Sequence, residues 1–500
     1  MKIKKFLFLV VALLSLTIVA GCVNNGGGNR DIPGWDDSKQ NVTFYTWGSA
    51  EENALLQSVI DNFMAEEGNE DINVLIVKAG NDYYGDLELR LAGNQSPDIV
   101  LMKPGYIQPF LRSGAIISLQ EYINNSELID PTTMIWEAND GYRYNKATKE
   151  IGGKDGEIYA IIKDFSPDFV MNYNKTLVTD AVAQVNYPKE GDTNYPSMST
   201  PMTYSQFIDF ASAMQTADEK TMGTALDNEP YQQLLEWIGQ AGGSLYTDNQ
   251  TKVVDIKNDP KVRQAFDYYR MLRDQCSANP IFDANGATFT QGKTGIAVTK
   301  QSSVQIGTGQ LKERQAASIF YGRWAYTSYN MDANPSSCVT GFAPPAVPNG
   351  LEITEDTKYA GITAMVGLAI SAKSQQKDAA FKFIEYYFTK GMEDMARIGY
   401  NIPGNKLVAS TTFLNDPTLT ENDKLINNFF FDLAENHSFV IEFNRYLSQS
   451  VVEKNVLTPH LSNYFAESKG KAFDIVLWEN TLDKIREDLQ EQLDKAVRAA

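Results

Sequence analysis

The chain contains few of the residues that metal centres and acid–base catalysis use most. Its 500 residues include two histidines, His437 and His460, and three cysteines. This leaves no spaced Cys/His set for structural zinc and few candidates for a histidine-based mechanism, so we expect no metal and no cofactor. Basic residues are scarce as well, with 44 Lys and Arg against 63 Asp and Glu and a formal net charge of −19. That imbalance argues against nucleic acid or an anionic membrane surface as a partner.

Long apolar runs are also missing, apart from residues 6–20. This run follows Lys2, Lys4 and Lys5, and its length is typical of a signal peptide rather than of a membrane span. It ends in Val19-Ala20-Gly21-Cys22, which resembles a bacterial lipobox. In that family of signals the cysteine is lipidated and begins the mature chain, which implies a signal peptide over residues 1–21. The alternative is an ordinary secretory signal with an incidental cysteine.

Residues 22–40 are rich in Gly and Asn and predict a flexible tether. Several acyl chains on Cys22 would anchor the protein stably, where a single chain would not. The expected location is therefore the cell envelope, lipid-anchored to the outer face of the cytoplasmic membrane, or the periplasm. In an exported protein Cys276 and Cys338 would form a disulfide only if the fold brings them together, and their spacing leaves that open.

The segment that follows the tether alternates between strand and helix patterns. Residues 41–47 alternate apolar and polar side chains, as a strand does. Ser49 and Glu52 then form a capping-box signature, and apolar residues recur at helical spacing until Gly68. Further strands are expected at 72–77 and 98–102, with a short helix between them. This alternation predicts an α/β fold with a largely parallel sheet, which binds ligands beyond the carboxyl ends of its strands.

The rest of the chain continues in mixed patterns. Residues 203–272 are mostly helical, strands are expected at 294–298 and 366–371, and a strongly periodic helix follows at 376–388. The last ~30 residues predict an amphipathic helix whose apolar stripe packs on the core.

Six stretches together match a known family in order and spacing. They are FYTWGSAEENALLQSVIDNFMAEEG (44–68), SPDIVLMKPGYIQPFLRSGAIISL (96–119), VMNYNKTLV (170–178), NEPYQQLLEWIGQAGGSLY (228–246), TFTQGKTGIAV (288–298) and VGLAISAKSQQKDAAFKFIEYYF (366–388). The chain resembles the extracellular solute-binding proteins of ABC importers, specifically the carbohydrate-binding class that includes the maltose-binding protein.

This resemblance implies a periplasmic-binding-protein-like fold of two α/β lobes, joined by hinge strands, that close on a ligand in the cleft between them. It also implies that each lobe is built from two separate pieces of chain. The first lobe is expected to hold residues 41–164 and 366–436, and the second residues 165–365 and 437–500.

A sugar needs flat aromatic surfaces for its C–H faces and polar side chains for its hydroxyl rim. Trp47 stands where the first strand turns into a helix and Glu51 follows it; the matching family positions often contact ligand. Tyr106 lies in the loop after the strand at 98–102, where Gly105 and Tyr106 replace an acid and an arginine of the maltose-binding protein. We expect Trp47, Glu51 and Tyr106 to contact ligand. The alternatives are that Trp47 packs under the helix and that Glu51 is a solvated acid in its first turn.

Three more candidates come from the second lobe. In Glu229-Pro230-Tyr231, the proline at a helix start would fix a rigid corner and direct Glu229 and Tyr231 into the cleft. The alternative is a helix cap with a buried tyrosine. The family often has a tryptophan near Ser302 that this chain lacks. Trp324, Tyr326 or Tyr329 could supply the missing stacking surface, and we expect Trp324 to do so. The alternative is that Trp324 is a surface aromatic that covers the lobe.

The function predicted from the resemblance is a membrane-anchored substrate-binding lipoprotein that captures a mono- or oligosaccharide by lobe closure and delivers it to an ABC permease. We do not expect an enzyme, because no pair of carboxylates is marked out by spacing. Two alternatives stay open. One is the same fold binding a polyamine, phosphate ester or metal, and the other is a sensor that presents the closed form to a receptor.

Overall fold

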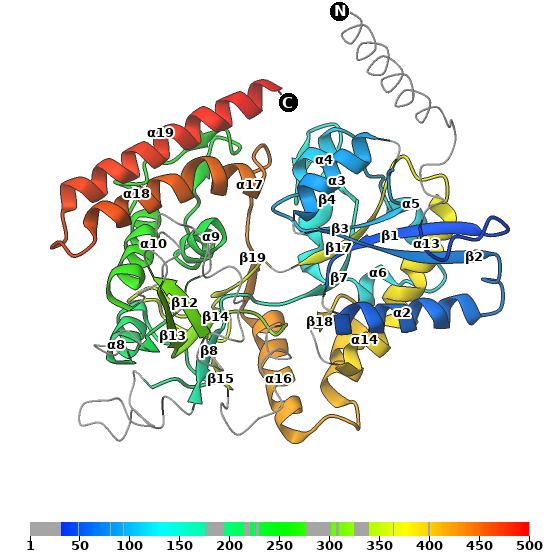
Figure 1. Cartoon of the computed structure of the whole chain (residues 1–500), viewed down its shortest axis with the longest axis horizontal. Coiled ribbons are helices and arrows are strands. Elements are labelled where there is room, and N and C mark those ends of the chain that lie inside the picture. Colours follow the sequence, from blue (N-terminus) through cyan, green and yellow to red (C-terminus); the bar gives the residue numbers. More distant parts are fainter. Residues whose placement is uncertain are drawn as a thin grey trace, which may run out of the picture.

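The computed structural model describes residues 32–48, 50–80, 82–93, 95–175, 178, 195–214, 221–224, 226, 230–276, 302–306, 310–324, 340–363, 365–398 and 401–499. It has two lobes, side by side in Figure 1, each with its own hydrophobic core. The signal segment, Cys22, Ser49, Glu229, the strand expected at 294–298 and Cys338 all lie outside the described residues.

The first lobe is organised around a six-stranded sheet of order β18-β7-β17-β3-β1-β2. Its strands are β1 Gln40–Thr46, β2 Ile72–Lys78, β3 Ile99–Met102, β7 Ile161–Phe165, β17 Val366–Ile370 and β18 Ile402–Pro403. β1 pairs in parallel with β2 and β3, as expected, whereas β17 lies antiparallel between β3 and β7, and β18 pairs antiparallel with β7. The sheet is therefore mixed, and the expectation of a largely parallel sheet is wrong for this half of it. Two antiparallel steps restore the direction, so β7 runs the same way as β1 and β3.

Helices cover both faces of this sheet, which is why six of the seven residues of β1 are buried. Phe44 packs edge-on against Phe383 of α13 (Lys377–Tyr386), which also contacts Phe63 of α2 (Ala50–Ala65). The next residue, Tyr45, points to the other face and stacks on Tyr83 of α3 (Tyr83–Ala92). The other elements of this lobe are α4 Gln108–Arg112, α5 Gln120–Asn125, α6 Pro131–Met134, β4 Arg143–Asn145, β5 Glu150–Ile151, β6 Glu157–Ile158, α14 Met392–Ile398, α15 Lys406–Val408 and α16 Glu421–Asn436.

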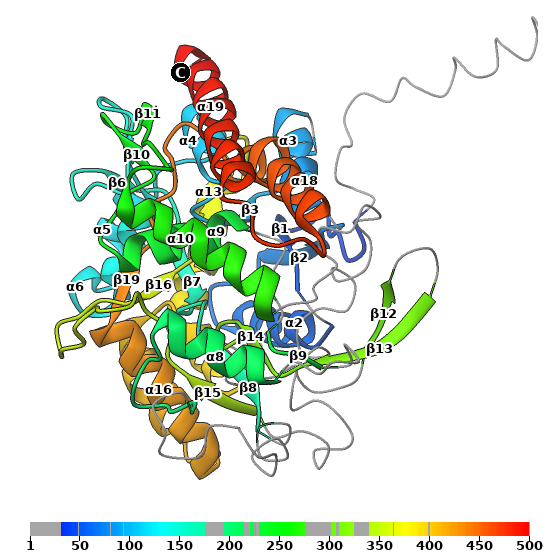
Figure 2. The ribbon, with the colours of Figure 1, turned by 90° about the vertical axis from the view of Figure 1, so that its left-hand side faces the viewer.

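Helices dominate the described part of the second lobe. They are α8 Tyr204–Met214, α9 Pro230–Gln240, α10 Pro260–Met271, α17 Gln449–Val452, α18 Thr458–Ser468 and α19 Ile475–Ala499. The strands are β8 Met171–Asn174, β9 Thr221–Met222, β10 Tyr246–Thr247, β11 Lys252–Val253, β12 Ser302–Ile306, β13 Gln310–Ala316, β14 Ser318–Phe320 and β15 Thr340–Ala343. Figure 2 shows the β12–β13 hairpin extending away from the body of the lobe.

The amphipathic C-terminal helix is confirmed. Leu482, Ile485, Leu489 and Leu493 of α19 are fully buried in the second core. Ile475, at the start of the helix, is 44% exposed, so the apolar stripe begins later than its spacing suggests. In the part of the chain that the structure describes, no helix combines the length and apolarity needed to cross a bilayer.

Three segments pass between the lobes and form the hinge. They are residues 166–170, β16 (Ala360–Ile362) and β19 (Ser438–Val440), and the last two pair in parallel. Pro167 forms a bridge with Ile362. The expected boundaries at 164/165, 365/366 and 436/437 stay predictions. Phe342, expected in the second lobe, packs with the first core because its ring meets Phe430 of α16 at 5.5 Å.

Candidate functional site

The carboxyl ends of three strands meet at one edge of the first sheet. Trp47 follows β1, the loop 103–106 follows β3, and Lys163 and Asp164 lie near the end of β7. Because these strands run the same way, their carboxyl ends lie at the same edge. In sheets of this kind, that edge is where ligands bind.

Four aromatic residues at this edge form one group, which we call the aromatic cluster: Trp47, Tyr83, Tyr84 and Tyr106. Tyr84 and Tyr106 are stacked, with ring centroids 4.1 Å apart and planes 4° apart. Trp47 meets Tyr83 edge-on at 4.4 Å and lies 6.2 Å from Tyr84. Tyr83 is buried, whereas the other three are partly exposed and offer ring surface at the edge of the lobe.

Hydrogen bonds from the backbone of β3 and of the loop after it hold the two tyrosines of α3 in place. The N–H of Leu101 donates to Tyr83 Oη and that of Lys103 donates to Tyr84 Oη, each at 2.8 Å. Burial raises the pKa of both hydroxyls well above the usual value. Sequence reasoning missed Tyr84, although a pair of tyrosines opening a helix next to two strand ends was a usable signal.

A polar group lies at the same edge, which we call the β7 charge group: Lys163, Asp164, Asn401, Glu52 and Tyr387. Lys163 pairs with Asp164, and Asn401 Nδ2 donates to Asp164 Oδ1 at 3.1 Å. The side chains of the pair are 15% and 20% exposed. Burial opposes the charge of Lys163, but Asp164, Tyr387 and Glu52 together raise its pKa above the usual value. The signal we missed is the Lys-Asp step in an otherwise apolar strand.

The second lobe touches the first at the loop that carries Tyr106. The N–H of Gln449 donates to the carbonyl of Gly105 at 2.7 Å. A Cβ at Gly105 would lie 2.6 Å from Gln449 Oε1 and 2.9 Å from Phe443, so only glycine fits this approach. Close by, the guanidinium of Arg112 lies over the ring of Tyr446 at 4.8 Å. The contact brings Phe443 and Gln449 next to the aromatic cluster.

Tyr231 lies further inside the second lobe. Its side chain has no exposed surface, and its hydroxyl hydrogen-bonds that of Tyr246 at 2.8 Å. Its ring packs edge-on against Phe443 at 6.0 Å, and its N–H donates to Glu453 Oε1 at 2.7 Å. In this arrangement Tyr231 supports Phe443 from behind, and its direct contact with ligand stays a prediction.

Trp324 is attached to the hinge. Its indole N–H donates to Asp168 Oδ1 at 3.1 Å, and Thr363 donates to the other carboxylate oxygen of Asp168 at 2.5 Å. Trp324 is partly exposed, so its role as a ligand contact also stays a prediction. The side chain of Glu51, as well as Glu229, Tyr326 and Tyr329, lies outside the described residues.

Cys276 is buried, with Sγ 3.4 Å from Ser212 Oγ and close to the carbonyl of Ile208. Burial raises the pKa of its thiol to about 11. Among the described residues, no group of His, Cys, Asp and Glu could hold a metal ion.

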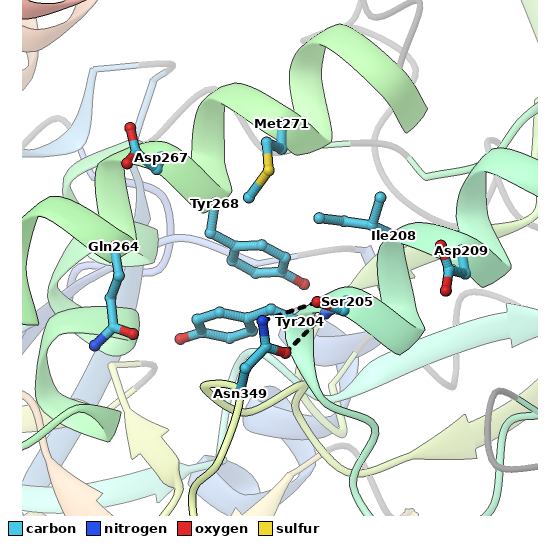
Figure 3. Close-up of a pocket in the computed structure, with 9 residues that line it drawn as sticks. All are labelled: Tyr204, Ser205, Ile208, Asp209, Gln264, Asp267, Tyr268, Met271 and Asn349. Carbon is cyan, nitrogen blue, oxygen red and sulfur yellow. Dashed lines mark hydrogen bonds between the residues drawn. The ribbon is translucent and has the colours of Figure 1, made fainter.

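A cavity of about 370 Å³ lies in the second lobe between α8 and α10 (Figure 3). It is lined by Tyr204, Ser205, Ile208, Asp209, Gln264, Asp267, Tyr268, Met271 and Asn349. The rings of Tyr204 and Tyr268 stack at 3.8 Å and form its wall. None of the predicted ligand residues lines this cavity.

Comparisons with known proteins agree with one another. The model of the bacterial extracellular solute-binding protein family matches residues 47–394. A maltotriose-binding protein of Pyrococcus abyssi is 21% identical over 398 residues, which cover 79% of this chain and 72% of that protein.

Solved structures with the same fold cover almost the whole chain. The substrate-binding protein Lmo0181 of Listeria monocytogenes, in complex with cycloalternan, has a TM-score of 0.62 at 18% identity and covers 92% of this chain and 99% of its own. UgpB of Mycobacterium tuberculosis, in complex with glycerophosphocholine, has a TM-score of 0.62 at 16% identity and covers 92% and 100%. At such identities these structures show the two-lobe α/β fold and leave the ligand open.

Proposed function

Because the chain belongs to the family of bacterial extracellular solute-binding proteins, we propose that it captures a mono- or oligosaccharide between its lobes and delivers it to an ABC permease. The observation that carries this proposal is the aromatic cluster, with its partly exposed rings at the strand ends of the first lobe. Such rings suit the C–H faces of a pyranose. The β7 charge group, at the same edge, offers carboxylate, amide and ammonium groups for the hydroxyl rim.

In this proposal Trp47 and Tyr106 contact the ligand directly, together with Tyr84. Glu51 and Glu229 remain candidates for hydroxyl contacts. Phe443 and Gln449 bring the second lobe to the same place. Tyr231, which packs on Phe443, and Trp324, which is hydrogen-bonded to the hinge, remain candidates for ligand contacts on that side. Closure works because contacts from both lobes stabilise the closed form, which a permease then recognises.

The alternative of a non-sugar solute has one specific observation behind it. UgpB, of equal structural similarity to the Listeria protein, was solved with glycerophosphocholine, a phosphodiester with a quaternary ammonium group. The aromatic cluster would suit such a cation too. In contrast, the only cation recorded over a ring of the cluster, among the residues that the structure describes, is Lys103, with Nζ 6.0 Å from the Trp47 ring. One lysine is little for a phosphate. We therefore place sugars first.

The test is a titration of the purified protein, followed by tryptophan fluorescence and calorimetry, against mono- and oligosaccharides, polyamines and phosphate esters. Saturable binding of one sugar class, weakened in Tyr106→Ala and Trp47→Ala, supports the proposal. Tyr122→Ala is the matched control, because Tyr122 stacks on Phe381 of the first lobe outside the cluster. Binding of a control solute and of no sugar would overturn the substrate class, and cleavage of an oligosaccharide would overturn the non-enzymatic role.

Anchoring through Cys22 is part of the same proposal. Cys22→Ala is expected to move the protein from the detergent phase to the aqueous phase in a phase-partition assay and to abolish labelling with a radioactive fatty acid. Labelling that survives the substitution would contradict the anchor. Whether the closed form serves an importer or a receptor would be separated by deleting a neighbouring permease gene and measuring uptake of the bound sugar.

A further inference from the structure

The three hinge segments meet at Gly361. This residue pairs with Phe439 of β19, and its carbonyl accepts a hydrogen bond from the N–H of Asp168 at 3.3 Å. Its own N–H points the other way, into the second lobe, and donates to Glu236 Oε1 of α9 at 3.0 Å. A helix of the second lobe therefore holds the central hinge residue through one carboxyl group.

Glu236 is an unusual residue at this position because it has no exposed surface. Oε1 also accepts from Gln240 Nε2 at 3.2 Å, but Oε2 has no hydrogen-bond partner. A Cβ at position 361 would lie 1.6 Å from that oxygen, so the close approach depends on glycine. An ionised carboxylate with an unpartnered buried oxygen is costly, whereas the neutral acid is much less so.

Within the described part of the chain, the groups that act on Glu236 include no positively charged side chain. The groups that face it are the N–H of Gly361 from β16, the amide of Gln240 on its own helix, the hydroxyl of Tyr204 from α8 and the carboxylate of Asp168 from the hinge. Ile441, after β19, approaches the same Gly361 from the apolar side. Burial first, and then the charge of Asp168, raise the pKa of Glu236 to about 8.

Hydrogen bonds continue from this carboxyl group through the second lobe. Gln240 Nε2 also donates to the carbonyl of Tyr359, just before β16, at 2.8 Å. Tyr204 donates to Gln240 Oε1 at 2.7 Å, and Tyr204 is a wall of the cavity in Figure 3. Glu236 and Gln240 thus tie β16 to α8 and α9 at two successive points.

We propose that Glu236 is a positioning residue for lobe closure: its neutral carboxyl group holds Gly361 in the hinge arrangement seen here, and its ionisation loosens that hold. The ionised group needs water at Oε2, and water reaches it only if α9 and β16 separate. Ionisation therefore favours a more open arrangement of the lobes and weakens ligand capture. The ligand readout rests on the proposed function, whereas the effect on lobe arrangement does not.

The test compares the wild-type protein with Glu236→Gln, which keeps an oxygen for the Gly361 N–H but cannot ionise. Small-angle X-ray scattering without ligand is measured from pH 6 to pH 9, together with the dissociation constant of the tightest solute from the panel. Glu435→Gln on α16 is the matched control, because it removes an exposed acid paired with Lys406. Should Glu236→Gln fail to fold, Glu236→Met supplies a neutral side chain of similar length.

We expect the radius of gyration of the wild type to increase between pH 7 and pH 9 and its affinity to fall about tenfold, the equivalent of one pKa unit of difference between the two arrangements. Glu236→Gln should keep the pH 6 values throughout, and Glu435→Gln should behave as wild type. A wild-type scattering curve that does not change, or the same change in Glu236→Gln, would overturn the proposal. If no solute in the panel binds, the scattering arm still decides it, and only the proposed function fails.

Discussion

The rings of Tyr84 and Tyr106 stack face to face at 4.1 Å, although one belongs to α3 and the other to the loop after β3. This stacking joins two separate strand–helix connections into one surface. It also makes each ring dependent on the other for its orientation, so the two are expected to act as a unit in binding.

Removing either ring should therefore weaken ligand binding by a similar amount. We expect Tyr84→Ala and Tyr106→Ala each to raise the dissociation constant about 10- to 100-fold, since a buried aromatic contact contributes about 1–3 kcal/mol. The double variant should be little worse than either single one, as measured by calorimetry. Strictly additive losses would contradict a shared surface, and Tyr122→Ala should leave the affinity unchanged.

Gly105 controls how closely the lobes approach. In Gly105→Ala the new Cβ would lie 2.6 Å from Gln449 Oε1 and 2.9 Å from Phe443, so the second lobe has to move away. We expect affinity to fall about tenfold and the radius of gyration to increase, with little change in unfolding temperature. The control is Gly80→Ala, where the new Cβ would meet nothing within 4 Å. Wild-type affinity in Gly105→Ala would show that this contact is absent from the closed form.

Much of the architecture follows from local sequence patterns. α9, α10, α13 and α19 lie where helical spacing predicts them, because each buries one apolar stripe on a neighbouring core. The antiparallel β17 between β3 and β7 does not follow from such patterns. Its pairing joins residue 368 to residues 101 and 161, and local periodicity carries no information about partners so distant.

The same division applies to the candidate site. The place of Trp47 and Tyr106 after strands, together with the family resemblance, predicts both as ligand contacts, and the structure brings both to one edge. The pair of tyrosines at the start of α3 marks Tyr84 as a candidate, but its stacking on Tyr106 depends on how α3 packs on β3. Tyr231 is fully buried, and its ring packs against Phe443, which comes from a distant segment of the chain that no local pattern connects to Tyr231.

Glu236 should also make stability depend on pH. Its pKa is about 8 in the folded protein and 4.5 as a free side chain. Because the pKa is higher in the folded protein, the contribution of Glu236 to the free energy of unfolding keeps its full value below pH 4.5. It decreases as pH rises toward 8, because the unfolded chain then binds fewer protons than the folded one. The loss is at most a few kcal/mol, since one pKa unit equals about 1.4 kcal/mol.

The measurement is the free energy of unfolding by urea at pH 5, 6, 7 and 8, for the wild type and for Glu236→Gln. Other groups titrate as well, so the difference between the two proteins is the relevant quantity. We expect this difference to shift in favour of Glu236→Gln as pH rises. A difference that is constant over this range would mean that the carboxyl group is already ionised at pH 5.

The ion pair of Lys163 and Asp164 is expected to matter for both stability and binding. Asp164→Ala would leave Lys163, whose side chain is 15% exposed, without the carboxylate that pairs with it at the proposed ligand edge. Breaking a largely buried pair from one side costs about 3 kcal/mol or more, because the remaining charge is poorly hydrated. We expect a lower urea midpoint and weaker solute binding in the same variant.

The exposed pair of Lys390 and Glu66, with side chains 59% and 37% exposed, is the control. Glu66→Ala should cost no more than about 1 kcal/mol and leave binding unchanged, because water screens such a pair. Equal losses in the two variants would mean that Lys163 reaches solvent, and the β7 charge group would then have no special role in holding the ligand.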